Sequence, residues 1–331
     1  MPHGGRWFVI VVVMLGAFGC QVGSDAATAT PTPASTVLML KLIVQPDVGA
    51  QPIVSLLNSA QKTIRMEMYW LTDREVIDAL KTARGRGVDV RVILEAQPLG
   101  GNSSNRPATN DLQAANVSVR TGNPAYRLMH EKAIVVDDRV ALIATFNQTR
   151  ASFTANREYG ILDTNPDDVA EIVRVFEADW QRVAPTLSNP NLVWSPVNAR
   201  QRLTTLIDRA QQTLDMQTGE MQDRAIEDRL IAAIQRGVTV RVVMSPAPSG
   251  SDQSAAAQAR LWRGGVQLRF VKMPYIHANM IISDNERAFV GSQSISTASL
   301  DSNRELGILI TDSQIVQVLS ETFAHDWNIG R

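Results

Sequence analysis

The sequence predicts an α/β fold built from two copies of one domain, and two observations support this prediction. Short apolar runs typical of strands alternate along the chain with amphipathic segments of helical spacing. The chain also repeats itself: RGVDVRVIL (86–94) matches RGVTVRVVM (236–244), and FEADW (176–180) matches FAHDW (323–327), at offsets of 150 and 147 residues. Solenoid repeats are roughly 20–50 residues long, so offsets of this size indicate duplication of a whole domain.

The first copy is expected to run through a defined order of elements. They are a strand over 39–44 and its neighbours, a helix with apolar residues at Ile53, Leu56, Leu57 and Ala60, a half-buried strand in which Ile64, Met66, Met68 and Trp70 alternate, a helix over 73–85 and a buried strand over 88–94. Residues 96–110 and 246–258 are rich in small and polar residues, so we expect loops beside the functional site. Residues 185–196 are the expected linker between the copies.

The N-terminal segment carries signals of export. Arg6 precedes an apolar run over 7–18, which is too short to span a bilayer and fits the apolar part of a secretory signal peptide over 1–20. Cys20, the only cysteine, directly follows the tripeptide AFG, as in a bacterial lipoprotein box; the alternative is an ordinary signal peptide. Residues 21–38, rich in Ala, Thr, Pro and Ser, are expected to form an extended tether. We therefore expect an extracytoplasmic bacterial protein, lipid-anchored at Cys20 or secreted.

Two stretches hold the same ionisable residues at the same spacing. They are HEKAIVVDDRVALIATFNQTRASFTANRE and HANMIISDNERAFVGSQSISTASLDSNRE, in which His130, Asp137, Thr145 and Glu158 correspond to His277, Asp284, Ser292 and Glu305 at one offset of 147 residues. A histidine held by a carboxylate through one ring nitrogen can act as nucleophile or proton donor near neutral pH. Glu158 and Glu305 are the candidate carboxylates.

The neighbours of the first histidine predict a phosphate site. Lys132 points to the same side of a strand as His130, which places a cation beside the ring. Thr145 and Asn147 add neutral hydrogen-bond donors, and this combination suits an anionic tetrahedral group, most commonly phosphate. Asp137 and Asp284 end apolar runs, so they are expected to be structural turn residues. The sequence shows no metal-ligand spacing, so no metal or other cofactor is expected.

The pattern His130-x-Lys132-x4-Asp137, followed by Asn147 and Glu158, resembles the HKD motif of the phospholipase D superfamily. The resemblance covers residues 39–331, and its two-copy arrangement is much more specific than a single motif. The second copy departs from the pattern, since Asn279 stands at the lysine position and Ser294 at the position of Asn147.

The resemblance implies two α/β/α domains, 39–184 and 191–331, related by pseudo-twofold symmetry, with one active site at their interface in a monomeric chain. It implies that His130 attacks a phosphodiester to form a phosphohistidine and that His277 protonates the leaving alcohol, although the reverse assignment stays open. Glu158 and Glu305 would orient the rings. The residues expected to bind the phosphoryl oxygens are Lys132, Thr145, Asn147, Asn279, Ser292 and Ser294, with Lys272 as a possible substitute cation in the second half.

Composition bears on the substrate. Lys plus Arg number 32 against 33 Asp plus Glu, a net charge of −1, and aromatic residues make up 5% of the chain. Dedicated nucleic-acid binders usually show a basic excess and stacking aromatics. Several arginines nevertheless lie around the first motif: Arg120, Arg127, Arg139, Arg150 and Arg157. A nuclease is therefore disfavoured without being excluded.

Three hypotheses remain. The first is a membrane-tethered phospholipase D-type phosphodiesterase that hydrolyses phospholipids or exchanges their head group. The second is a secreted nuclease of the same superfamily. The third is a catalytically weak lipid- or phosphate-binding protein, suggested by Asn279 and Ser294 and opposed by the retention of both histidines and both glutamates. A cardiolipin synthase-like transferase, a variant of the first, ranks lower because the apolar run over 7–18 is too short to span a membrane.

Overall fold

The computed structural model describes residue 1 and the ranges 39–98, 105–247 and 252–331. The predicted signal peptide, Cys20 and the tether over 21–38 lie outside these ranges. Within them, no helix combines the length and apolar character needed to cross a membrane. The described residues from Met39 onward belong to one compact unit.

The first half follows the predicted order of strands and helices. Its elements are β1 (Leu40–Gln45), α1 (Gln51–Ser59), β2 (Thr63–Met68), α2 (Arg74–Gly85), β3 (Asp89–Leu94), α3 (Arg106–Ala114), β4 (Ser118–Thr121), β5 (Lys132–Val136), β6 (Val140–Ala144), α4 (Arg150–Thr154), β7 (Asn156–Asp163) and α5 (Pro166–Gln181). Asp73 caps α2 by accepting a hydrogen bond from the Val76 amide. Gly87, at φ +92°, supplies the left-handed turn that leads into β3.

The second half repeats this order with small additions. Its elements are β8 (Leu192–Ser195), α6 (Ala199–Arg209), β9 (Thr213–Gln217), β10 (Met221–Gln222), α7 (Arg224–Gln235), β11 (Thr239–Met244), α8 (Ala255–Arg263), β12 (Gln267–Phe270), β13 (Tyr275–Ile276), β14 (Met280–Ser283), β15 (Arg287–Gly291), β16 (Ile295–Ser296), α9 (Thr297–Asp301), β17 (Glu305–Ile310) and α10 (Ser313–Ile329). Asp223 caps α7 through the Ile226 amide, as Asp73 caps α2.

The two halves build two mixed sheets of the same topology. The first has the order β1-β7-β6-β5-β2-β3-β4, and the second has β8-β17-β15-β14-β9-β11-β12. In each sheet, three strands at one side are parallel and the remainder are antiparallel. The predicted α/β class and the duplication are therefore both confirmed.

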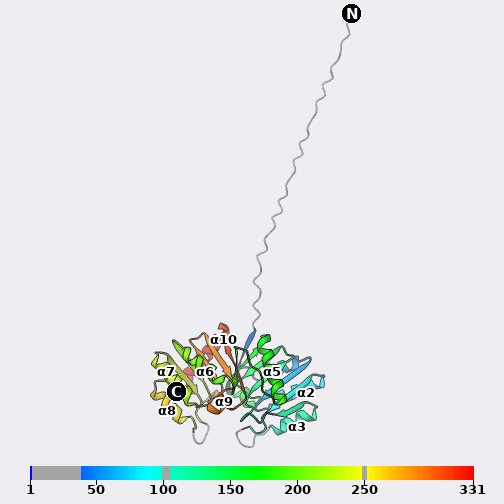
Figure 1. Cartoon of the computed structure of the whole chain (residues 1–331), viewed down its shortest axis with the longest axis horizontal. Coiled ribbons are helices and arrows are strands. Elements are labelled where there is room, and N and C mark those ends of the chain that lie inside the picture. Colours follow the sequence, from blue (N-terminus) through cyan, green and yellow to red (C-terminus); the bar gives the residue numbers. More distant parts are fainter. Residues whose placement is uncertain (2–38, 99–104, 248–251) are drawn as a thin grey trace. The chain divides into compact units, whose positions relative to one another are not determined.

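Three apolar clusters fix the layers. One lies between the first sheet and helices α1, α2 and α3, and another between the second sheet and α6, α7 and α8. The third contains residues of both sheets together with α5 and α10, so the two halves share one core. Figure 1 shows α2 and α3 on one side, α7 and α8 on the other, and α5, α9 and α10 between them.

Three local expectations were wrong. The expected loops over 96–110 and 246–258 both run into helices, because α3 begins at Arg106 and α8 at Ala255. Strand β2 is buried on both faces, because the face expected to meet solvent carries Arg65 and Glu67 against α5 and its neighbours. Within the expected linker over 185–196, Leu192–Ser195 forms β8, which pairs antiparallel with β17. The apolar run of β8 is thus an edge strand of the second sheet.

Candidate active site

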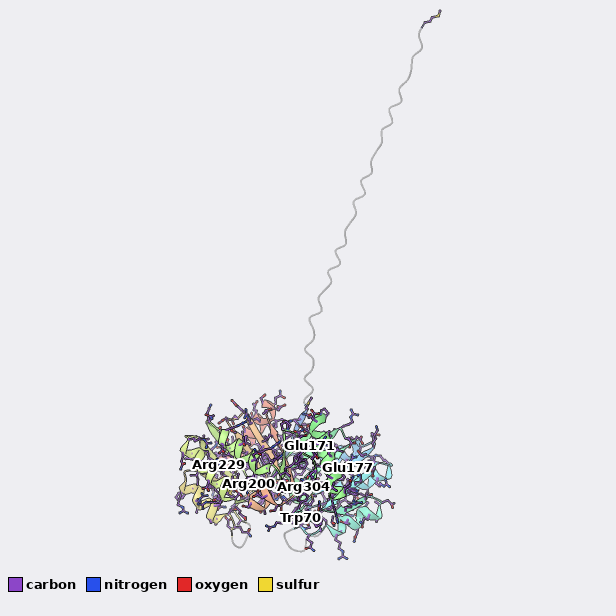
Figure 2. The ribbon with its side chains drawn as sticks, viewed as in Figure 1. Trp70, Glu171, Glu177, Arg200, Arg229 and Arg304 are labelled. Carbon is purple, nitrogen blue, oxygen red and sulfur yellow. The ribbon has the colours of Figure 1, made fainter. Side chains whose placement is uncertain are left out.

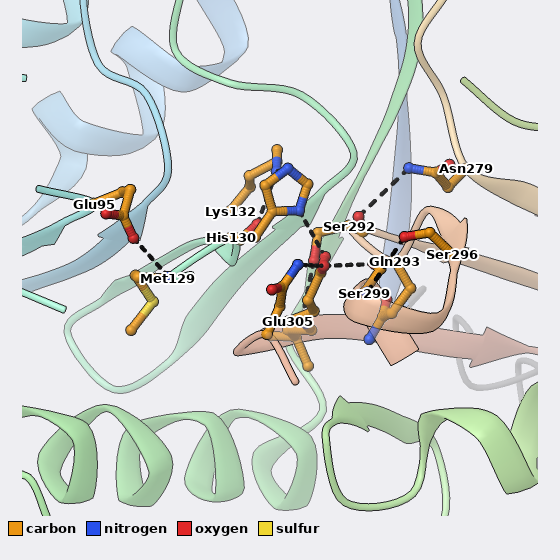
Figure 3. Close-up of polar contacts among 12 residues, drawn as sticks. Glu95, Met129, His130, Lys132, Asn279, Ser292, Gln293, Ser296, Ser299 and Glu305 are labelled. Carbon is orange, nitrogen blue, oxygen red and sulfur yellow. Dashed lines mark hydrogen bonds and ion pairs between the residues drawn. The ribbon is translucent and has the colours of Figure 1, made fainter. Parts of the chain in front are cut away.

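Each of the two repeated histidines pairs with the glutamate of the other half. The Nδ1 atom of His130 lies 2.8 Å from Oε2 of Glu305, and Nδ1 of His277 lies 2.7 Å from Oε1 of Glu158. Figure 3 shows the His130–Glu305 pair, with Lys132 on the other side of the ring. Both predicted glutamates therefore hold histidine rings, and each holds the ring of the other half.

The backbone explains the crossing. Ile276, just before His277, pairs with Arg157, just before Glu158, where β13 joins the first sheet through β7. Met129 forms the matching bridge to Arg304. The amide of His130 donates to the Arg304 carbonyl at 2.9 Å, which brings the start of β5 against the start of β17. Two short interdomain bridges thus place each histidine beside the other half's glutamate.

Neutral side chains fix both carboxylates. Glu305 accepts hydrogen bonds from Ser299 Oγ at 2.5 Å and Asn303 Nδ2 at 3.0 Å. Glu158 accepts from Thr145 Oγ1 at 2.7 Å and Asn156 Nδ2 at 3.4 Å. Oriented carboxylates of this kind keep the imidazole proton on Nδ1 and leave Nε2 toward the reacting group.

Thr145 and Ser292 were expected to bind substrate, but both hydroxyls form hydrogen bonds within the protein. Thr145 is fully buried and donates to Glu158, so it supports the dyad instead of facing the cavity. Ser292, its counterpart, is also fully buried, and its hydroxyl accepts a hydrogen bond from the Leu306 amide at 3.2 Å. Both hydroxyls lie near the site as predicted, but a position on a strand does not determine whether a hydroxyl faces a cavity or a carboxylate.

Lys132 and Asn279 occupy equivalent positions with different surroundings. Lys132 Nζ donates to the His130 carbonyl at 2.8 Å and lies 3.2 Å from His130 Nε2. Asn279 instead accepts from Thr218 Oγ1 at 3.1 Å and is directed at the Ser292 carbonyl. Lys272, the candidate replacement cation, is exposed and is not among the residues that line the cavity.

A cavity of about 530 Å³ opens at the paired histidines. Its lining residues come from both halves: Tyr69, Trp70, Arg127, Leu128, His130, Asn147, Glu220, Gln222, Gln253, His277, Ser294, Ser296, Thr297, Ala298, Ser299, Asn303 and Glu305. Of the residues predicted to bind substrate, Asn147 and Ser294 line it, whereas Lys132, Thr145, Asn279 and Ser292 do not. Gln253 belongs to the predicted loop over 246–258, of which 248–251 lie outside the described residues.

The electrostatics of the two rings differ in sign. Burial lowers the pKa of His130 and outweighs the raising effect of Glu305, and the Lys132 ammonium lowers that pKa further. The Glu158 carboxylate raises the pKa of His277 above its ordinary value. Burial lowers the pKa of Lys132 to about 8. These shifts favour the neutral form of His130 and the protonated form of His277.

The comparison with known families decides what kind of protein this is. The family model described as cardiolipin synthase, PLD-like domain, matches residues 53–180 and again 203–327. The two matches cover both halves and most of the chain. The protein belongs to the phospholipase D-like family.

Individual relatives of this phospholipase D-like protein are distant. Cardiolipin synthase B of Escherichia coli (strain K12) is 24% identical over 311 residues, which cover 80% of this chain and 74% of that protein. Mitochondrial cardiolipin hydrolase of Chlamydomonas reinhardtii is 27% identical over 124 residues, 38% of this chain and 54% of that protein. The solved phosphatidylserine synthase of Haemophilus influenzae Rd KW20 has a TM-score of 0.68 at 15% identity, covering 88% of this chain and 86% of that one. That last likeness shows the fold alone.

The aspartates of the two phospholipase D-type motifs lie away from the cavity. Asp137, in a left-handed turn, accepts hydrogen bonds from the backbone amides of residues 61–63, and Asp284 does the same for residues 211–213. These amides help hold the pKa of each carboxyl below its usual value, against the effect of burial. Both aspartates therefore tie the β5–β6 and β14–β15 turns to the loop before the neighbouring strand.

A set of buried ion pairs behind the phospholipase D-type motifs was missed. Arg304, next to Glu305, contacts Asp179 of α5, and Arg157, next to Glu158, contacts Asp326 of α10 at 2.8 Å. Figure 2 shows Arg304 in the middle of the fold. The signal was present in the sequence, because the NRE triplet and the aspartate of FEADW and FAHDW both recur.

Glu67, Glu131 and Asp179 form an acidic cluster at Arg304 that no sequence spacing revealed. One ligand atom from each lies within 4.8 Å of the others, and all three residues are buried. The cluster could hold a metal by distance alone. The guanidinium of Arg304 already faces Asp179, with Nε 2.7 Å from Oδ2, so a cation occupies that side.

Proposed function

We propose that this protein is a phospholipid phosphodiesterase that cleaves the head-group bond through His130 and transfers the phosphatidyl group to water or to another alcohol. The single observation that carries the proposal is the pair of crossed dyads in one cavity, with the pKa of His130 lowered and that of His277 raised. A neutral nucleophile opposite a protonated acid is the combination that displacement at phosphorus requires.

In the first step, Nε2 of His130 attacks the phosphorus. A nitrogen–phosphorus bond forms, the bond to the leaving alcohol oxygen breaks, and protonated His277 donates its proton to that oxygen. Lys132 lies close enough to His130 to act on the same phosphoryl group, and Asn147 lines the cavity beside it. Both would stabilise charge on the non-bridging oxygens as the displacement proceeds.

In the second step, His277, now neutral, removes a proton from water or from an acceptor alcohol. The oxygen of the acceptor attacks phosphorus, the nitrogen–phosphorus bond breaks, and His130 returns to its neutral form. Glu305 and Glu158 fix the ring orientations in both steps. Both half-reactions use the same two rings, so the acceptor alone decides between hydrolysis and transfer.

The relatives support a phospholipid as substrate. One is named cardiolipin synthase and another cardiolipin hydrolase, so the names cover transfer and hydrolysis. The similarity to the synthase covers both halves, and it supports the transferase hypothesis, which the short apolar run over 7–18 had ranked lower. The cavity lining is mostly neutral and polar, with serines, a threonine and amides that suit a hydroxyl-bearing head group or acceptor.

The test uses the full chain in micelles of mixed phospholipids with EDTA and ethanol. Mass spectrometry should find phosphatidic acid and phosphatidylethanol, and His130→Ala should abolish both. His325→Ala is the matched control, because that histidine is exposed on α10 and lies outside the cavity lining. Products that persist in His130→Ala would contradict the proposed nucleophile, and no product from any phospholipid would redirect the search to nucleic acid.

We also propose, from the sequence alone, that Cys20 carries a lipid anchor that holds the enzyme at a bacterial membrane outside the cytoplasm. Metabolic labelling with a palmitate analogue should mark the wild-type protein, and Cys20→Ser should lose the label and leave the membrane fraction. Labelling of the Cys20→Ser variant would contradict the anchor.

A further inference from the structure

Behind the His130–Glu305 dyad lies a buried cluster with more acids than bases. Glu67 from β2, Glu131 from the residue before β5 and Asp179 from α5 surround Arg304. Each of these four residues is at most 3% exposed. Tyr126 adds a hydroxyl that accepts a hydrogen bond from Arg304 Nη2 at 2.5 Å.

The second half holds the same cluster without the extra acids. Gln217 stands at the position of Glu67, and Ala278 at the position of Glu131. Gln217 Nε2 donates to Asp326 Oδ2 at 2.8 Å, and the Arg157 guanidinium holds both oxygens of Asp326. Here the guanidinium faces one buried carboxylate, an amide stands in place of Glu67, and the second carboxylate within reach, that of Asp47 at 3.4 Å, is exposed to solvent. The duplication thus supplies a charge-balanced reference for the first cluster.

The first cluster is not balanced in this way. Arg304 already faces both oxygens of Asp179, with Nε 2.7 Å from Oδ2 and Nη2 3.0 Å from Oδ1. Among the described residues, both oxygens of Glu67 and the Oε2 atom of Glu131 are buried without a hydrogen-bond partner. Two further ionised carboxylates in a buried site would repel each other and Asp179, and burial makes that repulsion strong.

We propose that Glu67 and Glu131 share a proton and act as a positioning pair for the His130–Glu305 dyad. While the pair keeps this proton, Arg304 stays on Asp179, and its carbonyl holds the His130 amide. When the proton is lost to solvent, the pair gains one more negative charge, and both carboxylates then compete with Asp179 for the same guanidinium. Because Arg304 directly precedes Glu305, this competition disturbs the carboxylate that holds the His130 ring. The role of the dyad rests on the proposed function.

The charged groups around the pair agree with this protonation. Burial raises the pKa of Glu67, and the neighbouring Glu131 and Asp179 raise it further against Arg304. Burial raises the pKa of Glu131 to about 8, with Arg304 lowering it and Asp179 and Glu305 raising it. Lys132, on the far side of the motif, is the other cation close to Glu131.

The sign of the linked stability effect follows from these directions. The folded protein keeps a proton that the unfolded chain releases near the ordinary glutamate pKa of about 4.3. The stabilisation is therefore fully present below that pH and is lost as the pH rises toward about 8, the pKa of Glu131 in the folded protein. Thermal stability of the wild type should fall across this window.

The second half provides the variants that test this. Glu67→Gln and Glu131→Ala convert the cluster to the residues of its counterpart, singly and together, and the isosteric Glu67→Gln preserves packing if the double variant folds poorly. The fall in Tm between pH 5 and pH 8 should be at least halved in each folded variant. Glu177→Gln is the matched control. Arg91 and Arg65 lower the pKa of Glu177, so removal of this carboxylate should change the pH dependence of stability only in acid, below the pH 5–8 window. An unchanged fall in Glu67→Gln would overturn the proposal.

Two further readouts separate a positioning pair from a merely structural one. In proton NMR, the downfield imidazole N–H resonance of His130, assigned with His130→Ala, should shift across pH 6–9 in the wild type and shift less in the double variant. Equal shifts in both proteins would overturn the positioning role. If EDTA lowered the Tm of the wild type but not of the double variant, a metal ion would be the occupant and the proposal would fall. None of these readouts needs turnover, so a failed phospholipid assay would leave them intact.

Discussion

The two half-sites have the same dyad and opposite chemistry. In the first, His130 lies against the Lys132 ammonium and its side chain is 18% exposed; in the second, Asn279 replaces that cation and His277 is 36% exposed. The pKa of His130 is lowered and that of His277 is raised. The missing lysine, which from sequence suggested a weakened site, instead helps make the two rings different. Burial and the Lys132 cation lower the pKa of His130, whereas at His277 the Glu158 carboxylate outweighs burial and Lys132 and raises the pKa.

The largest effect should come from replacing each histidine by alanine and comparing substrates whose leaving groups do or do not need a proton. His130→Ala should abolish turnover of every substrate, because no other nucleophile stands in its place. His277→Ala should reduce turnover of phospholipids by about 10²–10⁴-fold, the usual range for a lost general acid. With a p-nitrophenyl phosphodiester, whose leaving group needs no proton, His277→Ala should recover most of its rate. Recovery by His130→Ala instead would reverse the assignment.

A smaller effect is expected from replacing Lys132, and a smaller one still from replacing Asn279, the residue at the equivalent position of the second half. Lys132→Met removes a charge-assisted contact worth about 1.5–3 kcal/mol, so kcat/KM should fall by about 10–150-fold. Asn279→Ala should change kcat/KM by less than about threefold, which corresponds to under about 0.7 kcal/mol, because Asn279 is neutral and accepts a hydrogen bond from Thr218, whereas Lys132 Nζ lies 3.2 Å from His130 Nε2. Steady-state kinetics on micelles measures both, and equal losses would show that Asn279 also contacts the phosphate.

Arg127 offers a further contrast, because the first half supplies this cavity cation and the second half supplies Glu220. No hydrogen bond or ion pair is recorded for the Arg127 side chain among the described residues. Arg127→Ala should raise KM by about fivefold at low salt, the equivalent of about 1 kcal/mol for an exposed charge pair. Arg127→Lys should retain much of the affinity. Arg139→Ala, an exposed arginine outside the cavity lining, is the control, and an equal rise there would indicate general attraction to the anionic surface.

The smallest effect concerns pH. Because Glu158 raises the pKa of His277, Glu158→Gln should lower it, so the acid form is lost at lower pH and the alkaline limb of kcat moves down. Because Glu305 raises the pKa of His130, Glu305→Gln should move the acid limb of kcat/KM down. Each shift should be about one pH unit or less, given one hydrogen-bonded carboxylate removed. If Glu158→Gln moved the acid limb and Glu305→Gln moved the alkaline limb, the assignment of acid and nucleophile to the two histidines would have to be reversed.

The fold was largely accessible from sequence because strand and helix periodicities repeat in both halves. Pairing across the halves was not accessible, since the equal spacing of His130 and Glu158 gives no information about which glutamate meets which ring. The places of Thr145 and Ser292 were missed for a related reason. A strand fixes the face on which a hydroxyl lies, while burial and the carboxylate beneath it depend on the partner strand.

The acidic cluster shows what remains hidden even after a motif is recognised. Glu131 stands inside the motif as its variable position, and Glu67 lies in a strand that seemed half-exposed. Only the packing of α5 against the first sheet brings Asp179 to both of them. Alignment of the two repeats nevertheless shows that neutral residues, Gln217 and Ala278, stand at the positions of the two glutamates.

The crossing of the dyads also means that neither half carries a complete site by itself. The carboxylate that holds His130 belongs to residue 305 in the second half, and the carboxylate that holds His277 belongs to residue 158 in the first. A first half that folds before the second has docked therefore presents a histidine whose ring no carboxylate orients. On the proposed function, catalysis begins only when the two halves have assembled.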